Sequence, residues 1–179
     1  ALLLSQQQGL DEARGYLQQL RLEHPSQSAA LFQIEANLLL SAKQTDAAMA
    51  ILSSGLEAHP NNSQLLYARS MVAELQNNFA LAEQDLRALL AMDADNTTAL
   101  NALGYTLADR TTRYAEAKSL IERAHQLKPE DPAILDSLGW IYYRTGNLTQ
   151  AETYLRLALK MYPDAEIAAH LGEVLWAQG

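Results

Sequence analysis

The chain repeats one pattern of large apolar and small residues at intervals of 34 or 35 positions. The copies start at residues 29, 63, 97 and 132, which are separated by 34, 34 and 35 residues. The copy from Pro132 is the best preserved, with its pattern residues at Leu135, Leu138, Gly139, Tyr142, Ala151, Leu155 and Ala158. A unit of this length cannot bury its apolar face alone, so neighbouring copies must stack to form a continuous core.

Each copy has the signals of two helices joined by a short turn. Asp131 and Pro132 suit a helix start, because Asp caps the first N–H groups and Pro needs no partner at the first helical position. Small residues such as Gly139 and Ala151 fall where paired helices would approach closely. This pattern resembles the tetratricopeptide repeat (TPR), a helix–turn–helix unit of about 34 residues. The resemblance implies an all-α TPR solenoid, a right-handed superhelix of about ten antiparallel helices.

The repeat boundaries predict a single array over residues 1–179. It comprises a partial repeat 1–28, repeats 29–62, 63–96, 97–131 and 132–164, and a half repeat 165–179. Ala1 to Gly9 are interpreted as the tail of a first helix, and the third full copy has one extra residue in the turn at Arg110–Arg113.

The two ends predict a fragment of a longer protein, because the last helix has no polar capping helix after it. We therefore expect Leu171 and Leu175 to be exposed, with self-association through the ends of the chain.

Composition narrows the possible functions. A net charge of −8 argues against nucleic-acid binding, which depends on a basic surface. With no cysteine there is no disulfide and no thiolate metal site, and this suits the periplasm and the cytosol equally. The four histidines lack an HxxxH pair, and no phosphate-binding glycine loop or GxSxG motif occurs. We expect no catalysis, no cofactor and no metal.

In TPR proteins the first helix of each repeat lines a concave groove, and the resemblance carries five positions per helix over to this chain. The resulting candidate protein-binding residues are Asn37, Tyr67, Met71, Asn101, Tyr105, Asp109, Asp136, Trp140, Tyr143, Arg144, Glu173 and Trp176. We expect Tyr105, Trp140 and Tyr143 to be exposed anchors for a peptide segment, although some of these aromatics could instead pack between helices. Carboxylates outnumber the single cation Arg144, which favours a positively charged partner. Gln33 stands where TPR domains that bind C-terminal carboxylates have Lys, so that mode is disfavoured.

Residues Asn101 to Gly179 resemble one group within the family more specifically, the long TPR lipoproteins of the proteobacterial periplasm. The similarity includes the run NALGYTLADRTTRYAEAKSLIERAHQLKPEDPAILDSLGWIYYRTG with its one-residue insertion. It implies an outer-membrane-anchored adaptor that binds a carboxy-terminal processing protease and its cell-wall hydrolase substrates. In that group the protease-docking segment lies towards the N-terminus.

Two other functions stay open on the sequence. One is a general scaffold for envelope polysaccharide export or pilus biogenesis. The other is a regulatory domain of a cytosolic enzyme, so a cytoplasmic location is also open. A lipidated cysteine after a signal peptide would favour the adaptor, and a C-terminal barrel or membrane domain would favour the scaffold.

Overall fold

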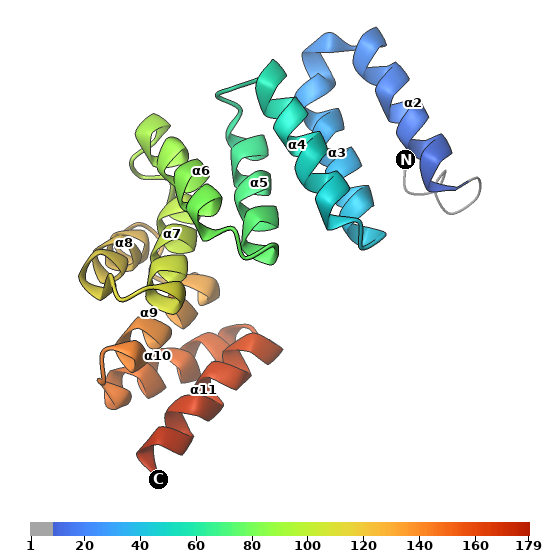
Figure 1. The fold of residues 1–179 in the computed structure, drawn as a ribbon. Coiled ribbons are helices and arrows are strands. Elements are labelled where there is room, and N and C mark those ends of the chain that lie inside the picture. Colours follow the sequence, from blue (N-terminus) through green and yellow to red (C-terminus); the bar gives the residue numbers. More distant parts are fainter. Residues whose placement is uncertain (1–8) are drawn as a thin grey trace. The chain divides into compact units, whose positions relative to one another are not determined.

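The computed structural model describes residues 9–179, and within them it contains ten α-helices, one short 3-10 turn and no strand (Figure 1). The predicted all-α TPR fold is confirmed. The chain divides into two compact units, Ala1–Asp85 and Leu86–Gly179, with the boundary inside one helix. The helices are α2 (Leu10–Glu23), α3 (Ser28–Ser41), α4 (Thr45–Ala58), α5 (Ser63–Leu75), α6 (Phe79–Met92), α7 (Thr97–Arg110), α8 (Tyr114–Leu127), α9 (Pro132–Arg144), α10 (Leu148–Met161) and α11 (Ala165–Gln178).

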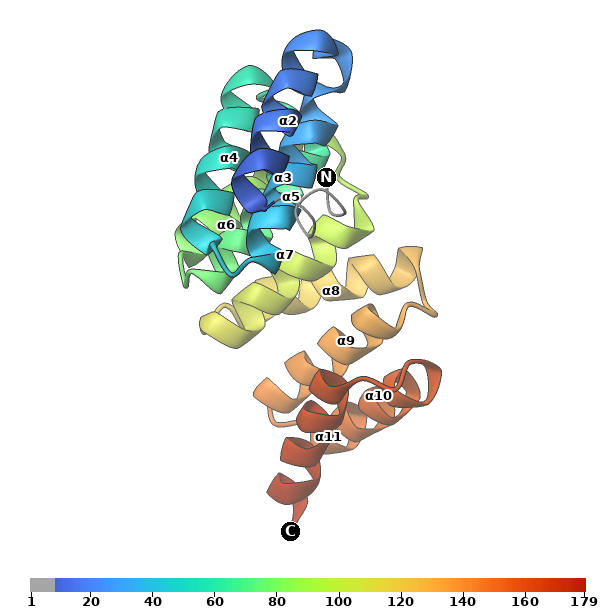
Figure 2. The same cartoon turned by 90° about the vertical axis from the view of Figure 1, so that its right-hand side faces the viewer.

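In unit 1, α3 packs against α2 and α4, and α4 packs against α5. Both views show α2, α3 and α4 side by side (Figures 1 and 2). Leu17, Leu39, Leu52 and Leu65 are fully buried along this series of helices. Each helix therefore contributes one apolar stripe to a serial core, as the repeat spacing predicts.

In unit 2, α7 pairs with α8 and α9 with α10, while α9 also contacts α7, α8 and α11. The core follows the repeat pattern, with Leu103, Ile121, Leu138 and Leu155 fully buried. This arrangement places α7, α9 and α11, the first helices of three successive repeats, next to one another in the order of the chain.

Close helix approach at the small residues is confirmed at Gly139. A Cβ atom built on this glycine would overlap the side chain of Leu155 and come within 3.2 Å of the Ala151 carbonyl oxygen. Gly104 is the equivalent residue of the preceding repeat, where a Cβ would collide with Ile121. Only hydrogen fits between these helices, so both glycines are required by packing.

The helix starts agree with the sequence signals. Asp131 caps α9 by accepting a hydrogen bond from Ala133 N at 3.0 Å, and Pro132 is the first helical residue, as predicted. Asn62 and Asn96 cap α5 and α7 in the same way. Since these caps satisfy N–H groups that the helix itself leaves free, they fix where each repeat begins.

The extra residue of the third copy lies in a helix and not in the turn. α7 has 14 residues, whereas α9 has 13. The turn 111–113, between the two helices of this repeat, has three residues, like the turns within the other three repeats. The other three turns use a left-handed residue, Lys43, Asn77 or Gly146. Thr111 has φ of −138° instead, and its hydroxyl donates to the Leu107 carbonyl oxygen at 2.6 Å and accepts from Arg113 N at 3.0 Å. The longer α7 therefore ends in a turn held by the Thr111 hydroxyl, which replaces the left-handed residue of the other three turns.

Two expectations about the ends change. Residues 1–8 lie outside the described part of the chain, and Gly9 is the non-helical N-cap of α2, with φ of 104°. Leu171 is only 7% exposed, so the prediction that it is exposed is wrong, whereas Leu175 is 37% exposed. Leu171 is buried because α11 packs on both α9 and α10. Among residues 9–179, no helix is both long and apolar enough to cross a bilayer.

Charged residues replace leucine at one core position of unit 1. Counting from the repeat starts, Glu35 and Arg69 occupy the place that Leu103 and Leu138 hold in unit 2. Glu35 accepts from Arg21 Nη1 at 2.5 Å and from Arg14 Nε at 3.0 Å, both on α2. These substitutions are tolerated because each buried charge is paired, which offsets its desolvation.

Arg69 makes a bidentate pair with Asp85 on α6, in which both N–O distances are 2.8 Å. Asp85 is 1% exposed. Hydrogen bonds from two guanidinium nitrogens leave neither carboxylate oxygen of Asp85 without a donor.

Candidate protein-binding surface

Six of the predicted groove residues come together on α7 and α9 of unit 2, where His170 of α11 joins them. They are Tyr105, Asp109, Asp136, Trp140, Tyr143 and Arg144, and we call the face that they form with His170 the first-helix surface. The repeat register carries them there, because residues four or eight positions apart lie on the same side of a helix. The surface is built from aromatic rings held in place by ion pairs and hydrogen bonds.

Asp109 and Arg144 fix one end of this surface. Arg144 Nη1 donates to the Asp109 carbonyl oxygen at 2.8 Å and to its Oδ1 at 3.4 Å. Arg144 Nη2 donates to the Tyr114 hydroxyl oxygen at 3.1 Å, and Trp140 Nε1 donates to Asp109 Oδ1 at 3.3 Å. The only cation of the predicted set is therefore engaged within unit 2, and α7, α8 and α9 are linked through it.

His170 forms the centre of the other end. Its Nδ1 lies 2.9 Å from Asp136 Oδ1, and its Nε2 lies 3.4 Å from the Tyr105 hydroxyl. The imidazole stacks on the Trp140 ring with centroids 4.2 Å apart and an angle of 26° between the planes. Tyr143 packs against the Trp140 ring, with centroids 5.2 Å apart and an angle of 35° between the planes.

Tyr105 reaches from α7 to the first turn of α11, where its hydroxyl donates to Glu166 Oε1 at 3.1 Å. Burial raises the pKa of Tyr105 well above its ordinary value, and the negative charges of Glu166, Asp109 and Asp136 raise it further. Tyr105 therefore stays a neutral hydroxyl across the physiological range and keeps the proton that it donates to Glu166.

The pKa of His170 is raised above its ordinary value by opposing effects. Burial alone would lower it, but the hydrogen bond and charge of Asp136, together with the charges of Glu166 and Glu173, outweigh burial. The site thus favours the imidazolium form of this histidine.

Two residues of the predicted site are less accessible than expected. Trp140 and Asp136 are each 7% exposed. The expectation that Trp140 is an exposed anchor is therefore wrong, because His170 covers one face of its ring. The alternative reading, packing between helices, describes Trp140, while Tyr105 and Tyr143 stay partly accessible.

The remaining predicted residues do not join this cluster. Glu173 is exposed on α11, and Trp176, near its C-terminal end, is 86% exposed. Asn101 donates to the Ala133 carbonyl oxygen at 3.5 Å. Three others belong to unit 1, and these are Asn37, Tyr67 and Met71.

Sequence reasoning missed three members of the network, His170, Glu166 and Tyr114. Glu166 occupies the second position of its repeat, one of the five lining positions, so the register itself could have identified it. His170 lies at the sixth position, next to a lining position. Tyr114 is on a second helix, and only its contact with Arg144 reveals its role.

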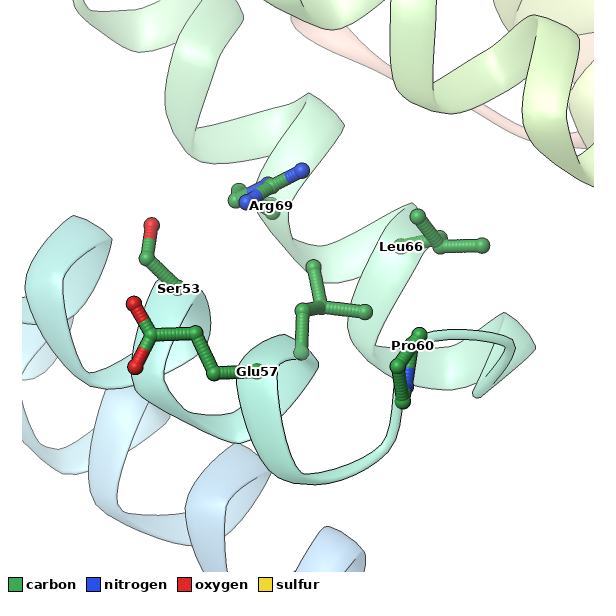
Figure 3. A pocket seen from close by; sticks show the side chains of 6 residues that line it. Ser53, Glu57, Pro60, Leu66 and Arg69 are labelled. Atoms are coloured by element: carbon green, nitrogen blue, oxygen red, sulfur yellow. The ribbon is translucent and has the colours of Figure 1, made fainter.

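Unit 1 contains a shallow pocket of about 290 Å³ between α4 and α5 (Figure 3). Ser53 and Glu57 project from α4, Leu66 and Arg69 from α5, and Pro60 lies in the connecting loop. The volume is at the low limit of the roughly 300–1,000 Å³ typical of small-molecule sites. Arg69 is already paired with Asp85, so the pocket offers no free cation to a ligand. Within residues 9–179, no group of three His, Asp or Glu side chains is arranged to hold a metal ion.

Comparison with known proteins identifies the repeat. Two family models, both described as tetratricopeptide repeat, match the chain. The first matches residues 4–72 and 111–174, and the second matches residues 67–132. A TPR repeat-containing protein of Pseudomonas aeruginosa is 56% identical over 164 residues, which is 92% of this chain. The chain spans only 28% of the length of that relative.

Two further proteins are similar to this chain in structure, and one of them, PilF, is also similar in sequence. A tetratricopeptide repeat protein from Parabacteroides merdae has a TM-score of 0.81 at 15% identity, over 98% of this chain and 70% of its own. The type IV pilus assembly protein PilF of P. aeruginosa is 26% identical over 178 residues, 98% of this chain and 64% of PilF. A solved structure of P. aeruginosa PilF superimposes with a TM-score of 0.65 over 96% of this chain and 71% of that one. Proteins built from such repeats are in general non-catalytic scaffolds with extended binding surfaces. The chain belongs to the tetratricopeptide repeat family.

Proposed function

We propose that this chain is the protein-binding part of a periplasmic adaptor that a lipid anchor outside residues 1–179 holds at the outer membrane. The adaptor binds a carboxy-terminal processing protease, or its cell-wall hydrolase substrates, or both. The similarity of Asn101 to Gly179 to the periplasmic TPR lipoproteins supports the biological role. The first-helix surface supports the binding role, and it is the observation that carries the proposal.

The chemistry of this surface suits a polypeptide segment. Tyr105 and Tyr143 are partly accessible rings on helices, and the buried Trp140 ring packs against Tyr143. Preorganised aromatics of this kind provide contact area at small entropic cost, so they are common anchors in protein interfaces. The exposed carboxylates of Glu166 and Glu173 add negative charge, which favours a partner segment with Lys or Arg.

Binding to purified partners tests the proposal. The protease and a cell-wall hydrolase of the source organism are titrated separately against this chain and against the full-length protein. We expect the hydrolase to bind both forms, because the first-helix surface is present in both. Protease binding by the full-length protein alone would place its docking segment outside residues 1–179. If neither protein binds either form, the adaptor function is wrong.

Similarity to PilF favours a second candidate, a scaffold in pilus assembly. The likeness extends over 98% of this chain at 26% identity. Deleting the gene separates the two functions. Loss of an adaptor would raise the cellular level of the hydrolase, since its degradation would slow, and would leave pili intact. Loss of an assembly scaffold would abolish pili without changing hydrolase levels.

A further inference from the structure

A continuous set of hydrogen bonds connects three first helices of unit 2 through one imidazole. The Tyr105 hydroxyl on α7 bonds with Glu166 at 3.1 Å and with His170 Nε2 at 3.4 Å, both on α11. On its other side, His170 Nδ1 bonds with Asp136 on α9 at 2.9 Å. Tyr105 and His170 are 65 residues apart in the chain, so this contact joins repeats that are not consecutive.

The number of protons available to these groups determines the protonation state of His170 in which every hydrogen bond of the network can form. Carboxylates only accept hydrogen bonds, so Asp136 requires a proton on His170 Nδ1, and Glu166 takes the single hydroxyl proton of Tyr105. The Tyr105 oxygen is then an acceptor, so Nε2 must also carry a proton. Both ring nitrogens are protonated only in the imidazolium ion. A neutral His170 bonded to Asp136 would instead compete with Glu166 for the Tyr105 proton, and one bond would be lost.

Charged groups surround the imidazole on every helix packed near it. α9 contributes Asp136 and, beyond the Trp140 ring, Arg144 at 5.9 Å from that ring's centroid. α7 contributes Asp109 beside Tyr105, and α11 itself contributes Glu166 and Glu173.

Two charges are engaged elsewhere. The Asp109 carboxylate is paired with Arg144 and Arg110. On α10, Glu152 accepts from Arg156 and from Gln178, near the C-terminal end of α11. The environment that remains around His170 is negative, and this stabilises its cationic form.

We propose that His170 is a pH-sensitive latch whose protonated form holds α11 to α7 and α9, and whose neutral form releases the bond to Tyr105. This inference goes beyond the proposed function and does not depend on it. The direction of the His170 pKa agrees with it. Because that pKa is raised, the latch is complete below about pH 6.5, the ordinary histidine value, and is lost as the pH rises through the higher pKa of the folded state.

Nuclear magnetic resonance and hydrogen exchange test the latch on the whole chain. The ¹⁵N shifts of the His170 ring report its protonation between about pH 5 and about pH 9. Amide exchange of α11, corrected for the intrinsic effect of pH and referred to α10, reports how firmly α11 is held. We expect His170 to titrate above the ordinary histidine pKa, and α11 protection to fall about tenfold in the same interval, as for loss of one charged hydrogen bond.

Tyr105→Phe removes the hydroxyl and keeps the ring. We expect its α11 protection at low pH to be no higher than that of the parent at high pH, because the variant lacks the bonds of Tyr105 to both His170 and Glu166. Tyr143→Phe, the same change on a ring that packs against Trp140, is the matched control and should behave like the parent. The proposal is overturned if His170 is neutral at pH 5, if it titrates without a change in α11 exchange, or if Tyr105→Phe retains the pH dependence of the parent.

Discussion

Gly139 and Gly172 occupy the same position of their repeats, counted from Pro132 and Ala165, but their surroundings differ. A Cβ on Gly139 would overlap Leu155, whereas a Cβ on Gly172 would meet nothing within 4 Å. The pair therefore separates packing from helix propensity at a single repeat position.

We predict that Gly139→Ala lowers the free energy of unfolding of this chain by about 1–3 kcal/mol, because the added methyl group overpacks the α9–α10 interface. Gly172→Ala should raise it by up to about 1 kcal/mol, since alanine is the better helix former and no neighbour is displaced. Urea denaturation of both variants measures this. Equal effects of the two substitutions would show that the helix contact at Gly139 is incorrectly placed.

Single residues also show how far sequence reasoning reached. The register brought six of twelve candidate residues to one surface, because helical periodicity fixes which side chains share a face. It could not determine that Trp140 is covered, since the covering residue, His170, comes from the next repeat. Exposure within the groove depends on these contacts between repeats, which the position in the repeat does not encode.

At the scale of elements, α5 and α6 are joined by a buried ion pair in which Arg69 holds the place of Leu103 and Leu138 in unit 2. Asp85 is 1% exposed, and the Arg69 side chain is 18% exposed. The repeat pattern alone predicts an apolar contact here, so the pair could not have been identified before Asp85 was seen to face Arg69.

We predict that Asp85→Leu destabilises unit 1, because Arg69 would lose its bidentate partner while staying largely covered. The cost should lie between the ~1 kcal/mol of a surface pair and the ~3–5 kcal/mol of a fully buried one. The double variant Arg69→Leu/Asp85→Leu should recover most of that stability, because it restores an apolar contact. Thermal melting of the two variants measures the difference. A double variant less stable than Asp85→Leu would mean that the site cannot accept an apolar pair.

The turn at 111–113 is a second feature of the elements that the repeat pattern did not predict correctly. The sequence revealed one additional residue between repeats, but the structure places it in α7 and changes the type of turn. The interval between repeats shows that a residue has been added, but it does not show whether that residue lies in a helix or in a turn. The hydroxyl of Thr111, which bonds at both sides of the turn, is the physical reason for this outcome.

At the scale of the whole molecule, we expect the net charge of −8 to favour encounter with a positively charged partner. We predict that the association rate with a basic hydrolase falls steeply as salt rises from about 0.01 M to about 1 M, where the screening length shortens from roughly 30 Å to 3 Å. The dissociation rate should change little, because the aromatic contacts are less sensitive to salt. Surface plasmon resonance at several salt concentrations separates the two rates. An association rate independent of salt would contradict steering by the acidic surface.

The proposal that a partner segment binds on the first-helix surface of unit 2 is tested most directly by removing one ring from that surface. Tyr143→Ala removes a partly accessible ring from this surface, and Tyr162→Ala removes a 58% exposed ring at the end of α10. Partner affinity is measured by calorimetry for both variants after circular dichroism has shown that they fold. We predict that Tyr143→Ala weakens binding by at least about thirtyfold, or about 2 kcal/mol, while Tyr162→Ala binds like the parent. A folded Tyr143→Ala variant with unchanged affinity, or a loss confined to Tyr162→Ala, would contradict the claim.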